Sequence, residues 1–291
     1  MSTTSLRPMA ARSRLRWGKV VEGTLIYVAV LIALGIMLLP IIWLVLTSIR
    51  PLVEIASTRL MFIPHQLTLE NYVQVFTVYH TTIYLRNSII VCVGVVATNM
   101  VIGPPAAYAL ARYRFRGEGL FFIFIIFMRM IPLVAIMVPL FVIFSRLHLL
   151  NTLASLIIAH TAFKLPVTIW LLRAFIMDIP QELDDSARVD GCTPVGVLVR
   201  ITLPLIKPGL AAMAVLAFLA TWNDLLVTLI LSNTIDTEMI ALGLTKFVLE
   251  YGVAWGPLTA GGVLMFIPTL LFVFVAERYL VRGLTMGAVK E

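Results

Sequence analysis

The sequence predicts an all-α polytopic membrane protein, and its composition is the first reason. Of the 291 residues, 60% are hydrophobic and only 13% are charged, and the mean hydropathy is +1.01. Soluble domains carry about 25% charged residues. The second reason is a set of six apolar runs, each long enough to cross about 30 Å of hydrocarbon as a helix. These observations exclude an ordinary soluble domain, and the apolar content also excludes a disordered chain.

The six predicted spans are distributed along the whole chain. We place them at residues 24–48, 87–110, 119–145, 153–177, 209–232 and 258–280. The first run follows five basic residues, as the apolar part of a secretory signal would, but it is about 25 residues long. Signal sequences have shorter apolar regions and a small-residue cleavage site, which this run lacks. We therefore expect it to be retained as the first span.

The distribution of basic residues predicts the orientation of the spans. The segment before span one, the segments between spans two and three and between four and five, and the segment after span six together hold 15 of the 22 Lys and Arg residues, if the span-edge residues Arg173 and Arg278 are included. The alternate segments hold five. Because cytoplasmic loops of membrane proteins are enriched in Lys and Arg, we expect both termini in the cytoplasm. The net charge of +7 then reflects topology and not nucleic-acid binding.

This orientation divides the chain into predicted parts. They are a cytoplasmic N-terminal tail (1–23), a six-span domain (24–280, with its core at about 87–280), a cytoplasmic loop within that domain (178–208) and a cytoplasmic C-terminal tail (281–291). The two longer extracytoplasmic loops lie at 49–86 and 233–257. Each is too short to form a domain of its own.

The cytoplasmic loop predicts two short helices at a glycine corner. Pro180 suits a first helical turn, where its missing N–H costs nothing, and the acids that follow it are favoured at the positive end of a helix. Gly191 supplies a C-terminal cap. Thr193 then caps a second helix, which we expect to end before Pro204. The first helix is acidic, whereas helices on lipid surfaces are rich in Lys and Arg, so a protein partner with a basic groove fits better.

The same loop resembles the EAA motif of bacterial ATP-binding cassette (ABC) importer permeases. That motif reads roughly I-P-x-x-L-E-E-A-A-x-x-D-G-A/C, followed after a spacer by I-x-L-P. The matching residues are Ile179, Pro180, Leu183, Asp184, Asp185, Ser186, Ala187, Asp190, Gly191, Cys192 and Ile201-Thr202-Leu203-Pro204. Asp185 and Ser186 depart from the family pattern, which has Glu and Ala there, so the carboxylate at 185 is one methylene shorter.

Further matches resemble the carbohydrate-importer branch, which includes the maltose-type permeases. They are Asn87-Ser88, Ala107-Tyr108-Ala109-Leu110-Ala111-Arg112, Trp222-Asn223-Asp224 and the C-terminal segment from Arg282 to Lys290. The Asn-Ser pair and the C-terminal segment resemble the second, six-span permease of the heterodimer.

The resemblance implies a type I ABC-importer permease fold with cytoplasmic coupling helices. It implies that Leu183, Asp184, Asp185, Ser186, Ala187, Asp190, Gly191 and Cys192 couple the chain to a cytosolic ATPase. It further implies a second homologous permease, two ATPase copies, an extracytoplasmic solute-binding protein and a sugar substrate. No G-x-x-x-x-G-K-[ST] phosphate loop occurs in the sequence. We therefore expect no enzyme activity and no cofactor on this chain, with ATP and Mg²⁺ held by the ATPase subunits.

Charged residues inside a span usually face a cavity or a partner. Away from the span ends, three occur in the predicted spans, namely Arg129, Lys164 and Asp224. Lys164 and Asp224 lie at similar depth, and we predict that they pair beside the translocation path. The alternatives are a static pair that ties helices together, direct contact with a sugar, and separate partners for the two residues, including the second permease.

Trp222-Asn223-Asp224 has the chemistry of a sugar site, because it combines an aromatic face with polar groups. A role in gating or helix packing is equally compatible with these residues. Trehalose, maltose-like disaccharides and glycerol phosphates all stay open as substrates, since much of the selectivity would reside in the binding protein and the companion permease. A phosphate-bearing substrate would give Arg129 or Lys164 a role.

Two other classes of function compete with the importer. A stand-alone secondary transporter should carry membrane acids for ion coupling, often in inverted repeats, and only Asp224 qualifies. A membrane-embedded enzyme should show a cluster of His, Asp or Glu near one interface, which the sequence lacks. Neither alternative needs the cytoplasmic motif.

Overall fold

The computed structural model describes residues 10–57, 63–128, 130–249 and 252–286, without the side chains of 10–20, 126, 249 and 275–286. The helices are α1 (Ala10–Ser48), α2 (Leu52–Ile55), α3 (Glu70–Thr77), α4 (Thr81–Arg112), α5 (Glu118–Phe127), α6 (Leu133–Arg146), α7 (Leu153–Met177), α8 (Gln181–Val189), α9 (Pro194–Val197), α10 (Leu203–Leu205), α11 (Lys207–Trp222), α12 (Leu226–Leu231), α13 (Ile240–Gly243) and α14 (Trp255–Met286). A π-helical turn η1 (Leu198–Thr202) and a 3₁₀ turn η2 (Leu244–Phe247) join some of them.

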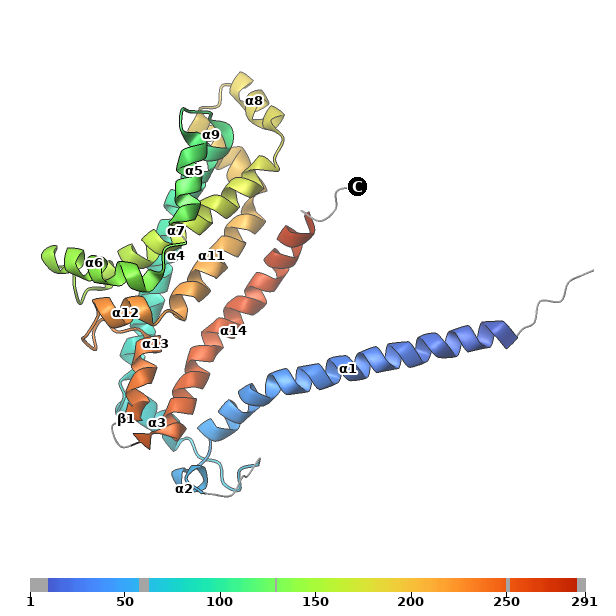
Figure 1. Cartoon of the computed structure of the whole chain (residues 1–291), viewed down its shortest axis with the longest axis vertical. Coiled ribbons are helices and arrows are strands. Elements are labelled where there is room, and N and C mark those ends of the chain that lie inside the picture. The colour runs from blue at the N-terminus through green and yellow to red at the C-terminus, as the bar shows by residue number, and fades with distance from the viewer. Residues whose placement is uncertain (1–9, 58–62, 129, 250–251, 287–291) are drawn as a thin grey trace, which may run out of the picture.

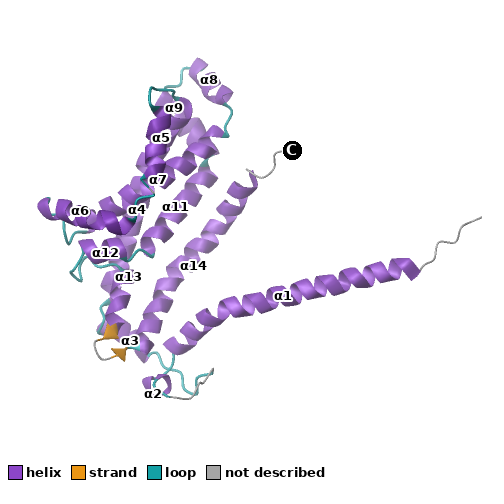
Figure 2. Ribbon diagram, viewed as in Figure 1, coloured by secondary structure: helices purple, strands orange, loops and turns teal. Residues whose placement is uncertain are grey.

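The long helices α4, α7, α11 and α14 form a bundle (Figure 1). Helices α8 and α9 lie at one end of it, and α3 lies near the other end with a small hairpin (Figure 2). The hairpin strands β1 (Val248–Leu249) and β2 (Gly252–Val253) are antiparallel, with Val248 opposite Val253. Helix α1 packs on α14 and then runs away from the bundle (Figure 1).

Four of the predicted spans are confirmed as apolar helices of membrane-spanning length. Among the described residues these are Val21–Ser48, Thr81–Arg112, Leu153–Met177 and Trp255–Phe274. A fifth is obtained if Pro194–Leu205 and Lys207–Trp222, which meet at a bend of 80°, count as one span.

The predicted continuous span at 119–145 is wrong, because the structure forms two helices there. Helices α5 and α6 are separated by residues 128–132, and α6 turns away from the direction of α5 (Figure 1). Pro132 occupies the N-cap position of α6. A proline disfavours helical backbone in the residue before it, so the apolar run breaks at this point.

The predicted span at 209–232 is also interrupted. Helices α11 and α12 are separated by residues 223–225. The carboxylate Oδ1 of Asp224 accepts a hydrogen bond of 3.0 Å from the amide of Val227, so it caps the start of α12 as Asp commonly does. Asn and Asp side chains compete with helical hydrogen bonding in this way, which explains a break that apolar content alone does not reveal.

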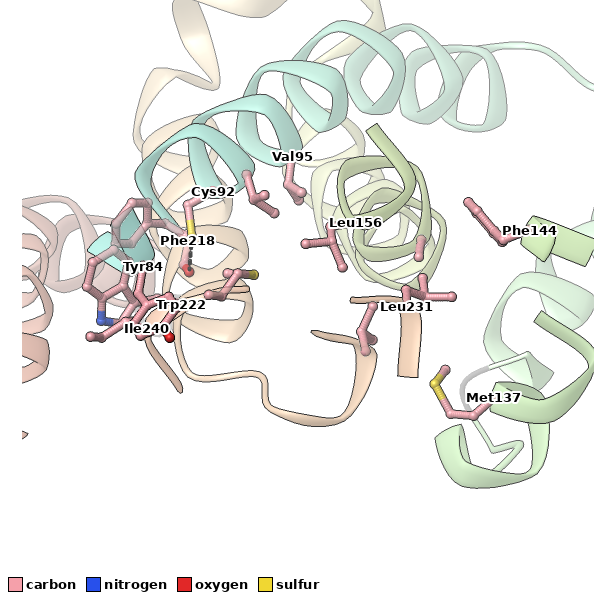
Figure 3. Packing of buried hydrophobic residues seen from close by; sticks show 14 residues of the cluster. Tyr84, Cys92, Val95, Met137, Phe144, Leu156, Phe218, Trp222, Leu231 and Ile240 are labelled. Atoms are coloured by element: carbon pink, nitrogen blue, oxygen red, sulfur yellow. Dashed lines mark hydrogen bonds between the residues drawn. The ribbon is translucent and has the colours of Figure 1, made fainter. Parts of the chain in front are cut away.

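The largest core cluster lies where α4, α7, α11 and α12 meet (Figure 3). It includes Tyr84, Val91, Cys92, Val95, Leu156, Phe218, Trp222 and Leu231. The Phe218 ring stacks on the rings of Trp222 and Phe272, with centroid separations of 5.6 and 3.6 Å. Helices α4 and α7 also approach closely near Gly103, where an added Cβ would lie 2.8 Å from Thr168 Cγ2. This packing fixes the positions of the helices that carry the candidate site residues.

Candidate functional site

The predicted pair of helices at a glycine corner is confirmed. Helix α8 follows Pro180, which is its N-cap residue and not part of its first turn. Gly191 has a φ of +85°, a left-handed conformation that glycine adopts easily at the end of a helix. Thr193 Oγ1 then accepts a hydrogen bond of 3.1 Å from the amide of Gly196 and caps α9.

The predicted end of the second helix before Pro204 is wrong. Helix α9 continues through the π-helical turn η1 into α10, which includes Pro204. The extra residue of a π turn lets the chain accommodate a proline without ending the helix. The bend comes at Ile206 instead, between α10 and α11.

Helix α8 has an inward face, which holds it against α4. Asp184 and Ala187 lie on this face, and Asp184 is only 1% exposed. The Asp184 carboxylate Oδ2 accepts hydrogen bonds from Arg112 Nε at 2.9 Å and from Tyr108 Oη at 3.1 Å. Arg112 Nη2 also donates to the carbonyl of Ile179 at 2.9 Å. Of the residues expected to couple to a partner, Asp184 and Ala187 therefore contact this chain itself.

The outward face of α8 remains available for a partner. Leu183, Asp185 and Ser186 are exposed on it, as are Asp190 and Gly191 at its end. Leu183 is 45% exposed, and Cys192 is half-buried against the neighbouring core. The exposed surface thus combines apolar and acidic groups on a helix whose other face is held firmly.

Sequence reasoning missed the role of Tyr108 and Arg112 at this site. The two residues are four positions apart, so both side chains lie on one face of α4. The sequence alone shows this spacing. It does not reveal that this face meets α8. Arg173 of α7 strengthens the same corner, since its Nε donates to the carbonyl of Leu110 at 3.0 Å and its Nη2 lies 3.6 Å from Glu118 Oε1.

The predicted pair of Lys164 and Asp224 is confirmed. Lys164 Nζ lies 3.5 Å from Asp224 Oδ2, and both side chains are 13% exposed. The buried His160, which the sequence did not assign to this site, places its Nδ1 3.3 Å from the same Nζ. Because a buried charge is costly without a partner, this group of three side chains is held together by electrostatic attraction and hydrogen bonding.

Lys164 and Asp224 line a cavity of about 650 Å³. Its wall comes from the break between α5 and α6, from α7 and from α11, and it includes Met130, Pro132 and Ala220. The two interrupted helices therefore meet at one cavity, whose mostly apolar wall carries the Lys164–Asp224 pair. In membrane proteins, irregular backbone at membrane depth is tolerated where it is buried or lines a cavity, and broken helices mark substrate sites in many transporters. Arg129, the third predicted charge, lies outside the described residues.

Trp222 and Asn223 do not line this cavity. Trp222 is 0% exposed, and its Nε1 donates to the carbonyl of Met265 on α14 at 3.0 Å. Asn223 is exposed, and its Nδ2 donates to the carbonyl of Leu219. The structure thus favours helix packing for Trp222 over sugar stacking. Of the two roles left open by the sequence, the sequence itself could not choose, because it does not show which way an indole ring points.

Comparisons with known proteins indicate the same kind of protein as the sequence motif in the cytoplasmic loop 178–208. Residues 100–286 match the family described as binding-protein-dependent transport system inner membrane component. The arabinooligosaccharides transport system permease protein of Halalkalibacterium halodurans is 35% identical over 256 residues, which cover 86% of this chain and 90% of that protein. The trehalose/maltose transport system permease protein of Thermococcus litoralis is 33% identical over 283 residues, which cover 94% and 98%.

The fold also resembles a solved structure. A chain from the crystal structure of a bacterial ABC transporter involved in the import of the acidic polysaccharide alginate superposes with a TM-score of 0.78. The match covers 95% of this chain and 99% of that chain, at 23% sequence identity. From the family match and the curated relatives, this chain belongs to the binding-protein-dependent transport system inner membrane components.

Proposed function

We propose that the chain is a permease subunit of an ATP-driven importer for a sugar or a sugar-like solute. The observation that carries the proposal is the two-sided helix α8. Its inner face is fixed to α4 through Asp184, and its exposed outer face carries Leu183 and Asp185. Such a helix transmits force from a partner only if it is held on one side and free on the other.

The partners follow from the same geometry. The basic-residue distribution supports an arrangement of six spans with both termini and the loop 178–208 in the cytoplasm. Two copies of a cytosolic ATPase would bind ATP and Mg²⁺, and one of them would dock on α8. The apolar α1 is mostly exposed before its last turn, which supports contact with lipid or with a second permease. An extracytoplasmic binding protein would deliver the solute.

The cavity beside Lys164 and Asp224 supports a neutral, hydroxyl-rich solute. Lys164 and Asp224, the charged residues of its described lining, are paired with each other at 3.5 Å, so this part of the wall offers hydrogen bonds without a large uncompensated charge. The names of the relatives, which refer to arabinooligosaccharides and to trehalose or maltose, support the same class of substrate.

Uptake measurements test this function against the alternative of a secondary transporter. Cells lacking the chain and cells complemented with it are given radiolabelled trehalose, maltose or arabinobiose. We expect one of these sugars to accumulate only in complemented cells, and arsenate, which depletes ATP, to stop that accumulation. Accumulation that survives arsenate but stops when an uncoupler collapses the proton gradient would support the secondary transporter. Uptake of none of these sugars would contradict the sugar assignment.

A further inference from the structure

Helix α4 is fastened at one end to α8 and to the turn before it by three hydrogen bonds, of which one runs from Tyr108 Oη to Asp184 Oδ2 at 3.1 Å. Arg112 spans both the side chain of Asp184 and the backbone carbonyl of Ile179, each at 2.9 Å. The side chains of the ion pair are 6% and 1% exposed, so water competes little with it. Ala187 of α8 also lies in one core cluster with Tyr108 and Leu110 of α4, and the Arg188 guanidinium lies 5.9 Å from the centre of the Tyr113 ring. These contacts, with Arg112 at their centre, therefore make α4 and α8 move together.

The opposite end of α4 is fastened to residues 232–247, here called the distal segment. Asn87 Nδ2 donates to the carbonyls of Ile235 and Glu238 at 3.2 and 3.0 Å. Ser88 Oγ accepts a hydrogen bond of 2.8 Å from the amide of Ile240. Asn87 and Ser88 are both fully buried, so these bonds are sheltered from solvent and hold the distal segment against α4.

An ion pair within the distal segment lies against α4 beside this second attachment. Lys246 Nζ lies 2.6 Å from Glu238 Oε2 and 5.5 Å from the centre of the Tyr84 ring of α4. Burial alone would lower the pKa of Lys246, but hydrogen bonding to Glu238 and Tyr84 outweighs it and raises that pKa. The lysine therefore stays charged and keeps Glu238 beside α4 at neutral pH.

Between its two attachments α4 is supported by α7. Asn99 Oδ1 accepts a hydrogen bond of 3.3 Å from Thr168 Oγ1, close to the tight approach at Gly103. Pro104 and Pro105 follow and remove two amide donors from the helix, so α4 is weakest where α7 braces it. Asn87 and Arg112 are 25 residues apart, or about 38 Å along the helix axis.

We propose that α4 transmits the movement of α8 to the distal segment, and that Arg112 and Asp184 are the positioning residues at its inner end. The proposal rests on the proposed function, in which an ATPase moves α8. Helix α8 and the distal segment are then two distinct sites that are coupled through α4. An allosteric connection requires two such sites. The distal segment thereby changes its position or exposure when ATP binds to the partner.

A fluorescence measurement on the purified transporter tests the coupling. Asp236 is exposed in the distal segment, so an environment-sensitive fluorophore is attached to Asp236→Cys, and the labelled chain without this substitution gives the background. We expect ATP plus vanadate to shift the emission in the otherwise unaltered complex. In Arg112→Gln the shift should fall at least about fivefold, the lower end of typical allosteric coupling, while the ATPase subunits stay bound.

Three further variants make the result specific. Asp184→Asn should reproduce Arg112→Gln, and Arg112→Lys, which keeps the charge but not the two-pronged contact, should give an intermediate shift. Arg114→Gln is the matched control, because Arg114 is exposed two residues beyond Arg112, and it should keep the full shift.

The proposal is overturned if Arg112→Gln and Asp184→Asn keep the full shift, or if the unaltered complex with its ATPase shows none. Loss of the ATPase from both variants would overturn it too, because the two residues would then serve assembly alone. Absence of any ATPase from the unaltered complex would instead contradict the proposed function.

Discussion

Replacing Asp185 by Arg is expected to release the ATPase from the membrane complex and to reduce ATP-driven uptake by about 100-fold. Asp185 is exposed on the outer face of α8, where a basic groove of the partner would receive it. Reversing its charge places like charges together, which costs several kcal/mol at an interface, and about 2.8 kcal/mol corresponds to 100-fold in affinity. The measurement is the amount of ATPase that co-purifies with the tagged chain in mild detergent.

Glu70→Arg is the matched control for this substitution. It changes the net charge equally on another exposed acid, but Glu70 belongs to α3, near the other end of the bundle from α8 (Figure 1). We expect it to retain the ATPase. If Asp185→Arg also retains the ATPase at the unaltered level, the outer face of α8 is not the docking surface.

Removing one partner of the Lys164–Asp224 pair is expected to have the next largest effect. Lys164→Met leaves the Asp224 carboxylate in the cavity without the cation that lies 3.5 Å away. Breaking a buried pair in this way costs about 3–5 kcal/mol, so we expect a lower melting temperature of the solubilised protein. In the double variant Lys164→Met/Asp224→Asn the stability should largely recover, because neither charge remains and the side-chain amide oxygen introduced at position 224 can still cap the amide of Val227.

Uptake by the double variant separates the two roles left open for this pair. If the pair only ties α7 to the α11–α12 break, uptake should recover together with stability. If the pair contacts the solute, uptake should stay low although the protein is stable again. A melting temperature that is unchanged in Lys164→Met and in Asp224→Asn would contradict a stabilising pair altogether.

Much of the fold can be predicted because the apolar runs determine it locally. The helices α1, α4, α7 and α14 correspond to long apolar segments, and Thr193 and Gly191 determine caps and turns through their own backbone preferences. The two breaks were harder to predict, since Pro132 and Asp224 lie in runs whose hydrophobicity alone suggests continuous spans. At those points a local hydrogen bond or a missing donor outweighs the apolar pattern.

The candidate site could be predicted only in part, for a different reason. The spacing of Asp184 and Ala187 identifies one face of α8, but the sequence does not show that this face meets Arg112, 72 residues earlier. Depth along the spans correctly paired Lys164 with Asp224, because depth depends only on residue counting. It could not place His160 next to them, or turn Trp222 away from the cavity, since both depend on how helices rotate against one another.

Native mass spectrometry of the complex isolated from its own membranes tests the central claim most directly. We expect a single assembly that contains this chain, a second permease and two ATPase subunits. In Asp185→Arg this assembly should lose the ATPase subunits. A chain that is isolated alone, or only with further copies of itself, without any ATPase subunit, would contradict the central claim.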